Sequence, residues 1–210
     1  MLPATRIAIE RRYSGGLLAR YCSLFREVVV RVGRLVSITA SMLLAVLAAG
    51  GGPAVGQTGF PPFAQAGLEA HNMYRARHGT PPMALTQDLV TRAQQCAQYY
   101  AGKGTIDHSC PYKNGAGENL YFASGGTPDA VQHVKAATQG WYNEIKDYDF
   151  NNPGFDYKTG HFTQLVWKAS TQLGIGFDTK NNKHFVVALY KEPGNLNTRE
   201  AFQENVPRPR

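Results

Sequence analysis

Residues 160–167 read GHFTQLVW, in which a histidine and two aromatic residues join an apolar run. The same kinds of side chain occur upstream, where His108 follows an aspartate, Glu118 lies in the segment GENL and Glu144 ends the segment WYNE. With His161 they make two histidines and two glutamates between positions 108 and 161. Each lies beside apolar or aromatic residues that would hold it against a core, so the four residues are a candidate site.

The formal charge of +7 is distributed unevenly along the 210 residues. Seven arginines and two glutamates lie in residues 1–56, so this segment carries +5 and the rest of the chain only +2. The basic character therefore belongs mainly to the first segment, and we expect no nucleic-acid partner for the remainder.

Residues 1–56 are predicted to be a basic leader. Residues 35–49 read LVSITASMLLAVLAA, with arginines before them and the small residues Ala54-Val55-Gly56 after them, which is typical of a secretory signal peptide. Continued to Gly56, the uncharged run also approaches the ~20 residues that span a bilayer, so a type II membrane anchor is an alternative. A mitochondrial targeting segment is a third alternative, against which the apolar density counts. The first two interpretations place residues 57–210 outside the cytosol, and we expect a secreted protein.

Cys96 and Cys110 lie outside the leader and form an even pair. In an oxidising compartment they would bridge a loop of about 15 residues, a cross-link worth about 3 kcal/mol. The alternative is two free thiols, which a cytosolic location would favour. The loop contains His108, so a bridge would also fix one side of the candidate site.

After a linker at residues 57–61, residues 62–210 change from helical to strand periodicity. Helices are predicted over residues 63–78, from Thr86 to Ala101, and from Thr127 through Ile145. Strands are predicted over residues 162–168, 173–177 and 185–190, the last two joined by a hairpin loop at 180–183. The polar tail 195–210 carries Phe202 and Val206, which are expected to pack back on the domain. Helices followed by an antiparallel sheet indicate an α+β domain.

The four other histidines are predicted to lie outside the candidate site. His71 lies on the amphipathic first helix and is expected to form internal hydrogen bonds. His78, His133 and His184 are expected at the surface.

Five segments occur in a fixed order: AHNMYRARHGTPPM (70–83), IDHSC (106–110), GENLYF (117–122), WYNEIKDYDFNNPGF (141–155) and TGHFTQLVWKAS (159–170). Together they resemble the signature segments of the CAP superfamily, which includes cysteine-rich secretory proteins, insect antigen five and group-one plant pathogenesis-related proteins. The resemblance covers nearly all of residues 62–210. It implies a three-layered α-β-α sandwich with a central antiparallel sheet. It also implies a central cleft lined by His108, Glu118, Glu144 and His161.

The resemblance further implies that this cleft accepts a divalent cation such as zinc. Two neutral imidazoles suit Zn²⁺ and leave coordination positions open, while carboxylates beside them fix their tautomers. Because two histidines alone make a weak site, we expect occupancy to be conditional. The alternative is a hydrogen-bonded cluster that only ties three segments together.

By the same resemblance we expect a binding protein rather than an enzyme, and no residue is predicted to be catalytic. A sterol or other lipid, a membrane surface or a protein is the expected partner. A metal-dependent hydrolase is the alternative, disfavoured because the sequence has neither an HExxH pair nor an evident third zinc ligand. An interaction module in defence or signalling is a further alternative, which no sequence feature separates from lipid binding.

Overall fold

A computed structural model describes residues 59–210, and the predicted leader lies outside the described residues. The helices and strands, in chain order, are α2 (Pro62–His78), β1 (Ala84–Leu85), α3 (Gln87–Lys103), the 3-10 helix η1 (Pro111–Lys113), β2 (Gly117–Ser124), α4 (Ala130–Asn143), the 3-10 helix η2 (Glu144–Asp147), α5 (Gly160–Val166), β3 (Gln172–Lys180), β4 (Lys183–Lys191) and α6 (Arg199–Asn205). Within residues 59–210, no helix combines the length and the apolar character needed to cross a membrane.

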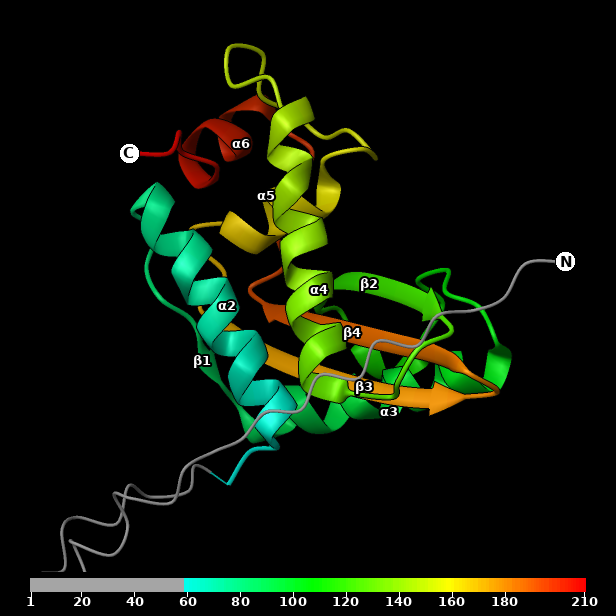
Figure 1. Ribbon diagram of the computed structural model, residues 1–210. Helices are drawn as coiled ribbons and strands as arrows, with labels where there is room; N and C mark the ends of the chain where they lie inside the picture. Colours follow the sequence, from blue (N-terminus) through cyan, green and yellow to red (C-terminus); the bar gives the residue numbers. More distant parts are fainter. Residues whose placement is uncertain (1–58) are drawn as a thin grey trace, which may run out of the picture. The chain divides into compact units, whose positions relative to one another are not determined.

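The four strands form one sheet in the order β1-β3-β4-β2, with helices on both faces (Figure 1). The two-residue strand β1 is parallel to β3, and the other pairings are antiparallel. Alternate residues of β4 point to opposite faces: Phe185 and Val187 pack with α3, whereas Val186 and Ala188 pack with α2 and α4. Both faces of this strand are therefore buried, which confirms the predicted α+β sandwich of three layers.

Two glycines of β3 allow helix α3 to lie directly on the sheet. A Cβ atom on Gly174 would come within 2.2 Å of the Leu89 main chain, and one on Gly176 within 2.1 Å of the Ala93 carbonyl oxygen. Any larger side chain would push the helix away. The close approach fixes which face of α3 points to the sheet. Cys96 and Tyr100, which hold the His108 side of the site, lie on that buried face.

Most of the predicted elements are confirmed, with some shifted boundaries. The loop between β3 and β4 is the expected hairpin, and Asn181 and Asn182 adopt the positive φ angles of such turns, 52° and 57°. The tail packs back as expected, because Phe202 is buried and its ring lies 5.1 Å from that of Trp167. Helix α4 begins later than predicted because Asp129, which accepts a hydrogen bond from the Gln132 N–H, is the N-cap.

Two predictions about residues 59–210 are wrong. Residues 162–168 were expected to form a strand, but most of them belong to helix α5. His78 and His184 were expected at the surface, but both are buried. The ring nitrogens of His78 lie within hydrogen-bond distance of the Tyr142 hydroxyl and the Pro207 carbonyl. Those of His184 lie within hydrogen-bond distance of the Thr179 hydroxyl and the Gly125 carbonyl. Both histidines can therefore be buried because all four nitrogens have partners.

Candidate functional site

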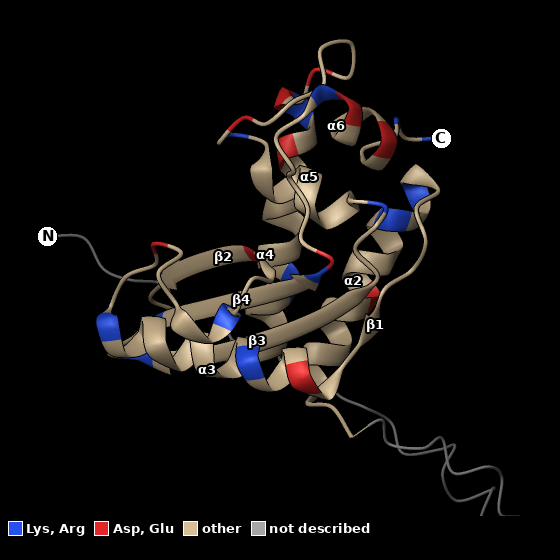
Figure 2. Cartoon of the chain, turned by 180° about the vertical axis from the view of Figure 1, so that it is seen from behind, with Lys and Arg blue, Asp and Glu red and all other residues tan. Residues whose placement is uncertain are grey.

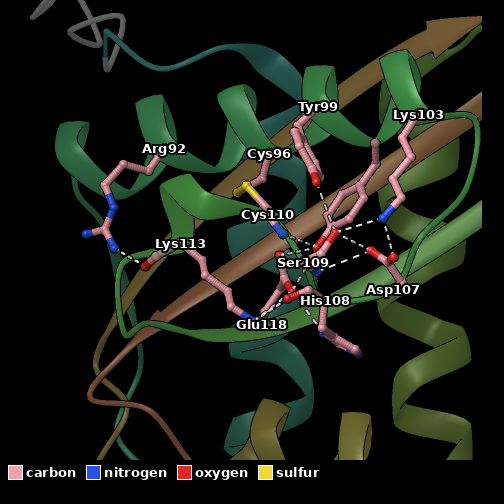
Figure 3. A network of polar contacts seen from close by, with 11 residues as sticks. Arg92, Cys96, Tyr99, Lys103, Asp107, His108, Ser109, Cys110, Lys113 and Glu118 are labelled. Carbon is pink, nitrogen blue, oxygen red and sulfur yellow. Dashed lines mark hydrogen bonds and ion pairs between the residues drawn. A yellow bond between two sulfur atoms is a disulfide. The ribbon is translucent and has the colours of Figure 1, made fainter.

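One side of the site is the pair formed by His108 and Glu118 (Figure 3). His108 lies in the loop after α3, and Glu118 is the second residue of β2. The imidazole Nδ1 of His108 lies 2.8 Å from Oε2 of Glu118. His108 has a φ of +60°, a left-handed conformation that costs energy for any residue with a side chain. The His108 backbone is therefore strained where the loop places the imidazole against the carboxylate.

The Glu118 carboxylate is almost completely buried and fully occupied by donors. Its side chain is 2% exposed, and the Tyr100 hydroxyl donates to it at 3.2 Å. The ammonium of Lys113 lies 3.7 Å from Oε2. Burial raises the pKa of Tyr100, with the Glu118 charge adding to the effect, so this hydroxyl keeps its proton and remains a donor. The carboxylate thus lies among His108, the Tyr100 hydroxyl and the Lys113 ammonium.

A disulfide between Cys96 and Cys110 ties the loop that carries His108 to helix α3, as predicted. The Cys110 N–H also donates to the Tyr100 hydroxyl at 3.1 Å. On the outside of the loop, Asp107 pairs with Lys103, and this contact, together with the Ser109 hydroxyl, lowers the pKa of Asp107 to about 2. The His108 side of the site is therefore held by one covalent bond and several short-range contacts.

The other side is the pair formed by His161 and Glu144. Nδ1 of His161 lies 2.6 Å from Oε1 of Glu144. The second oxygen of Glu144 accepts the backbone N–H groups of His161 and Phe162 at 3.0 and 3.1 Å. These two N–H groups are in the first turn of α5, so Glu144 caps this helix from a distant part of the chain.

Arg75 holds the opposite end of α5 and was missed by the sequence analysis. Its guanidinium is completely buried and donates to the carbonyl groups of Leu165 and Trp167, both at 2.9 Å. It also donates to the Ser170 carbonyl at 2.9 Å. Desolvation lowers the pKa of Arg75 to about 10, which leaves it charged at neutral pH. The one available signal was its place four residues after His71, on the helix stripe predicted to be buried.

A buried chain of hydrogen bonds links helix α2 to His161. His71 Nδ1 donates to the Gly67 carbonyl at 2.7 Å, and its Nε2 lies 2.9 Å from the Tyr190 hydroxyl. The Asn119 amide donates to that hydroxyl and to the His161 carbonyl, both at 3.0 Å. His71 is thus bonded internally, as predicted. Asn119 and Tyr190 were not predicted as part of the site.

The structure brings three of the four predicted residues to one pocket. A cavity of about 250 Å³ is lined by His108, Glu118, Asn119, Phe155, Tyr157, Gly160, His161 and Asn195. Glu144 is not in the lining and acts from behind His161. The side chains of the two histidines are 54% and 30% exposed, so both rings reach the cavity.

His108 and His161 are the two residues at this cavity that could hold a divalent cation. In each pair the carboxylate accepts the proton of Nδ1, which leaves the lone pair of Nε2 free in the neutral imidazole. A neutral imidazole of this tautomer can bind Zn²⁺ through Nε2. Within residues 59–210, however, no group of three or more His, Cys, Asp or Glu side chains is arranged to hold a metal ion. Such a cation would therefore keep open positions for water or another ligand.

A second, larger cavity lies between helices α2 and α4. Its volume is about 370 Å³, and its lining is mostly apolar. The lining residues are Ala66, Glu69, Ala70, Met73, Tyr74, Lys135 and Gln139. The two charged residues come from different helices, so the groove offers one cation and one anion to a bound molecule.

Known proteins resemble this chain in sequence and in structure. Human Golgi-associated plant pathogenesis-related protein 1 is 41% identical over 141 residues, which are 66% of this chain and 88% of that protein. Secreted protein RBT4 of Candida albicans is 37% identical over 64% of this chain, but the match spans only 36% of RBT4. A crystal structure of NaASP2 with Zn²⁺ has a TM-score of 0.57 at 24% identity, covering 70% of this chain and 88% of that one, and so shares the fold.

The family model described as CAP, the cysteine-rich secretory protein family, matches residues 68–190. This range contains all four residues of the candidate site and the disulfide. The chain therefore belongs to the CAP, or cysteine-rich secretory protein, family.

Proposed function

We propose that this protein is a non-enzymatic binding protein of an extracytoplasmic compartment, whose cleft holds a divalent cation such as Zn²⁺ between His108 and His161. The observation that carries the proposal is the pairing of each Nδ1 with a carboxylate, at 2.8 and 2.6 Å, beside one shared cavity. Both histidines line the same cavity with Nε2 not used in these pairs, and the two carboxylates would lower the charge cost of a cation there.

Binding is favoured over hydrolysis by the state of the two glutamates. A metal-dependent hydrolase needs a carboxylate free to accept a proton from water. Glu118 already accepts hydrogen bonds from His108 and Tyr100, and Glu144 accepts three from His161 and Phe162. Neither carboxylate is free for that role, which disfavours the hydrolase alternative.

Titration calorimetry of the full chain with ZnCl₂ tests the cation site. We expect one equivalent of Zn²⁺ to bind, and His108→Ala or His161→Ala each to weaken binding by about tenfold or more. His133→Ala is the matched control, because His133 lies outside the cavity lining. Binding that is unchanged in both site variants would contradict the proposal.

A lipid is the second candidate ligand, and the groove between α2 and α4 favours it. Its apolar lining suits an acyl chain or sterol ring, and Lys135 suits an acidic head group. Charges elsewhere are interspersed, with both signs on α3 and on α6, which suits a small ligand better than a polyanion (Figure 2).

Displacement of a fluorescent fatty acid, with and without competing sterol, tests the groove. We expect saturable binding that is lost in Ala70→Trp, because the new ring fills the cavity. Ala136→Trp is the control, since Ala136 is an exposed residue of α4 outside the lining. Equal binding in both variants would exclude this groove as the lipid site.

The compartment is proposed from the leader composition and the disulfide. Apolar residues 35–49 follow a run of arginines, and the bridge suits an oxidising environment. The name of one relative, a secreted protein of Candida albicans, supports the same location. Sequencing the N-terminus of the mature protein should give a chain that begins at Gln57. An intact leader in a membrane fraction would indicate the type II anchor instead.

A further inference from the structure

We infer that Lys113 lowers the affinity of the cleft for a divalent cation, because its ammonium offsets the negative charge of Glu118. The inference rests on the proposed cation site. It concerns a residue outside the cavity lining, which would change affinity without binding the cation itself.

Lys113 is held so that its ammonium lies close to both His108 and Glu118. It is the last residue of η1, and its ammonium donates to the His108 carbonyl at 2.6 Å. The same ammonium lies 3.7 Å from Oε2 of Glu118, the oxygen that accepts His108 Nδ1. Figure 3 shows Lys113 reaching from η1 to His108 and Glu118. With two partners in the same loop, the ammonium cannot move away without losing a hydrogen bond.

The two sides of the cleft therefore carry different charges before any cation binds. Glu118 and Lys113 together contribute no net charge, and the lysine side chain is 32% exposed. Glu144 has no such cationic partner, because among residues 59–210 its side chain pairs with the His161 imidazole and with no lysine or arginine. A cation between the two imidazoles would be attracted from the His161 side and repelled by Lys113 on the other.

Coulomb's law gives the size of the effect. A divalent cation and an ammonium several ångströms apart, at a partly exposed position, repel each other enough to weaken binding about three- to tenfold at low ionic strength. The repulsion is screened by salt, because Lys113 is not buried. A purely structural role for Lys113 would show no such dependence on ionic strength.

The test is Zn²⁺ titration calorimetry of the full chain carrying Lys113→Gln, which keeps a donor for the His108 carbonyl, and Lys113→Arg, which keeps the charge. Lys180→Met is the control, because it removes the same charge at the hairpin end. That end is six residues along β4 from the partner of Glu118, or about 20 Å away. Each protein is titrated in about 20 mM and about 500 mM NaCl, conditions that give long and short screening lengths.

We expect Lys113→Gln to bind Zn²⁺ about three- to tenfold more tightly than the wild type in low salt, and the difference to shrink in high salt. Lys113→Arg and Lys180→Met should bind like the wild type. Should Lys113→Gln fail to fold, Lys113→Met with the same readout replaces it. A wild type that binds Zn²⁺ while Lys113→Gln shows no gain, or a gain equalled by Lys180→Met, overturns this inference alone. Absence of Zn²⁺ binding in the wild type and in Lys113→Gln overturns the proposed cation site itself.

Discussion

The two histidine–glutamate pairs of the cleft use the same chemical groups but are held by different means. Glu144 holds His161 by capping helix α5, whose other end is held by Arg75. Glu118 holds His108 in a loop fixed by a disulfide. The first pair belongs to the long-range hydrogen bonding of the core, and the second is a local structure attached to α3. This difference predicts which substitutions and pH changes destabilise the His161 side and which destabilise the His108 side.

Removing the guanidinium of Arg75 should have the largest effect. Arg75→Met leaves at least three buried carbonyl groups without a donor, and we expect a loss of about 4 kcal/mol in the free energy of unfolding. Arg77→Met on the same helix is the control, because Arg77 is exposed. Urea denaturation measures both. Equal losses in the two variants would mean that Arg75 does not support α5 in this way.

Acid should loosen the His161 side before the His108 side. Burial lowers the pKa of His71 to about 4 from 6.5, so the neutral form is required by the fold. The stability that depends on it is complete above pH 6.5 and is lost as pH falls towards 4, by about 3 kcal/mol. The pKa of Asp107 is lowered from 3.8 to about 2, so its contribution to the His108 loop is lost only between those values.

Urea denaturation at a series of pH values separates the two windows. Asp107→Asn should weaken the pH dependence between 3.8 and about 2 and leave the upper one unchanged. Stability that is constant from pH 6.5 to 4 would contradict the role given to His71.

Breaking the disulfide should affect the opposite side. Cys96→Ala combined with Cys110→Ala opens a loop of separation 14, and we expect a loss of about 3 kcal/mol. Hydrogen exchange should accelerate in the loop around His108 more than in α5. Faster exchange in α5 alone would reverse the comparison between the two sides.

Removing the Glu144 carboxylate should cost about 2 kcal/mol, the upper range for a helix cap. Glu144→Ala should speed hydrogen exchange at the amides of His161 and Phe162, which then have no acceptor. Glu118→Ala is the matched variant, and it should leave those two amides protected. Protection of both amides in Glu144→Ala would show that the cap is dispensable.

These contacts also explain what the sequence could and could not predict. The helices α2 and α3, the β3–β4 hairpin and the disulfide follow from local periodicity, turn residues and cysteine spacing, and the structure confirms them. The four site residues were first marked as a candidate site by their residue types, and the family resemblance then implied that they line one cleft. Helix α5 was predicted as a strand because its aromatic and branched residues favour strands, and a seven-residue helix has little stability of its own.

What makes residues 160–166 helical lies elsewhere in the chain. Glu144 supplies a negative charge at the first turn, and Arg75 supplies a positive charge at the last carbonyl groups. Neither contact can be read from a window around α5. Arg75 was missed for a related reason, because an arginine on a helix is usually exposed and is buried only when a specific set of acceptors surrounds it.

Glycine substitutions should give the smallest effects, and the sign should differ between the two histidines. His108 has a φ of +60°, where a Cβ atom is unfavourable, so His108→Gly should be about 1 kcal/mol more stable than His108→Ala. His161 lies in the first turn of α5, where glycine is unfavourable, so His161→Gly should be about 1 kcal/mol less stable than His161→Ala. Alanine is the reference at both positions because it also removes the imidazole, so each difference isolates the backbone. Urea denaturation of the four variants measures both differences, and the same sign at both positions would show that the two histidines are not held by different backbone conformations.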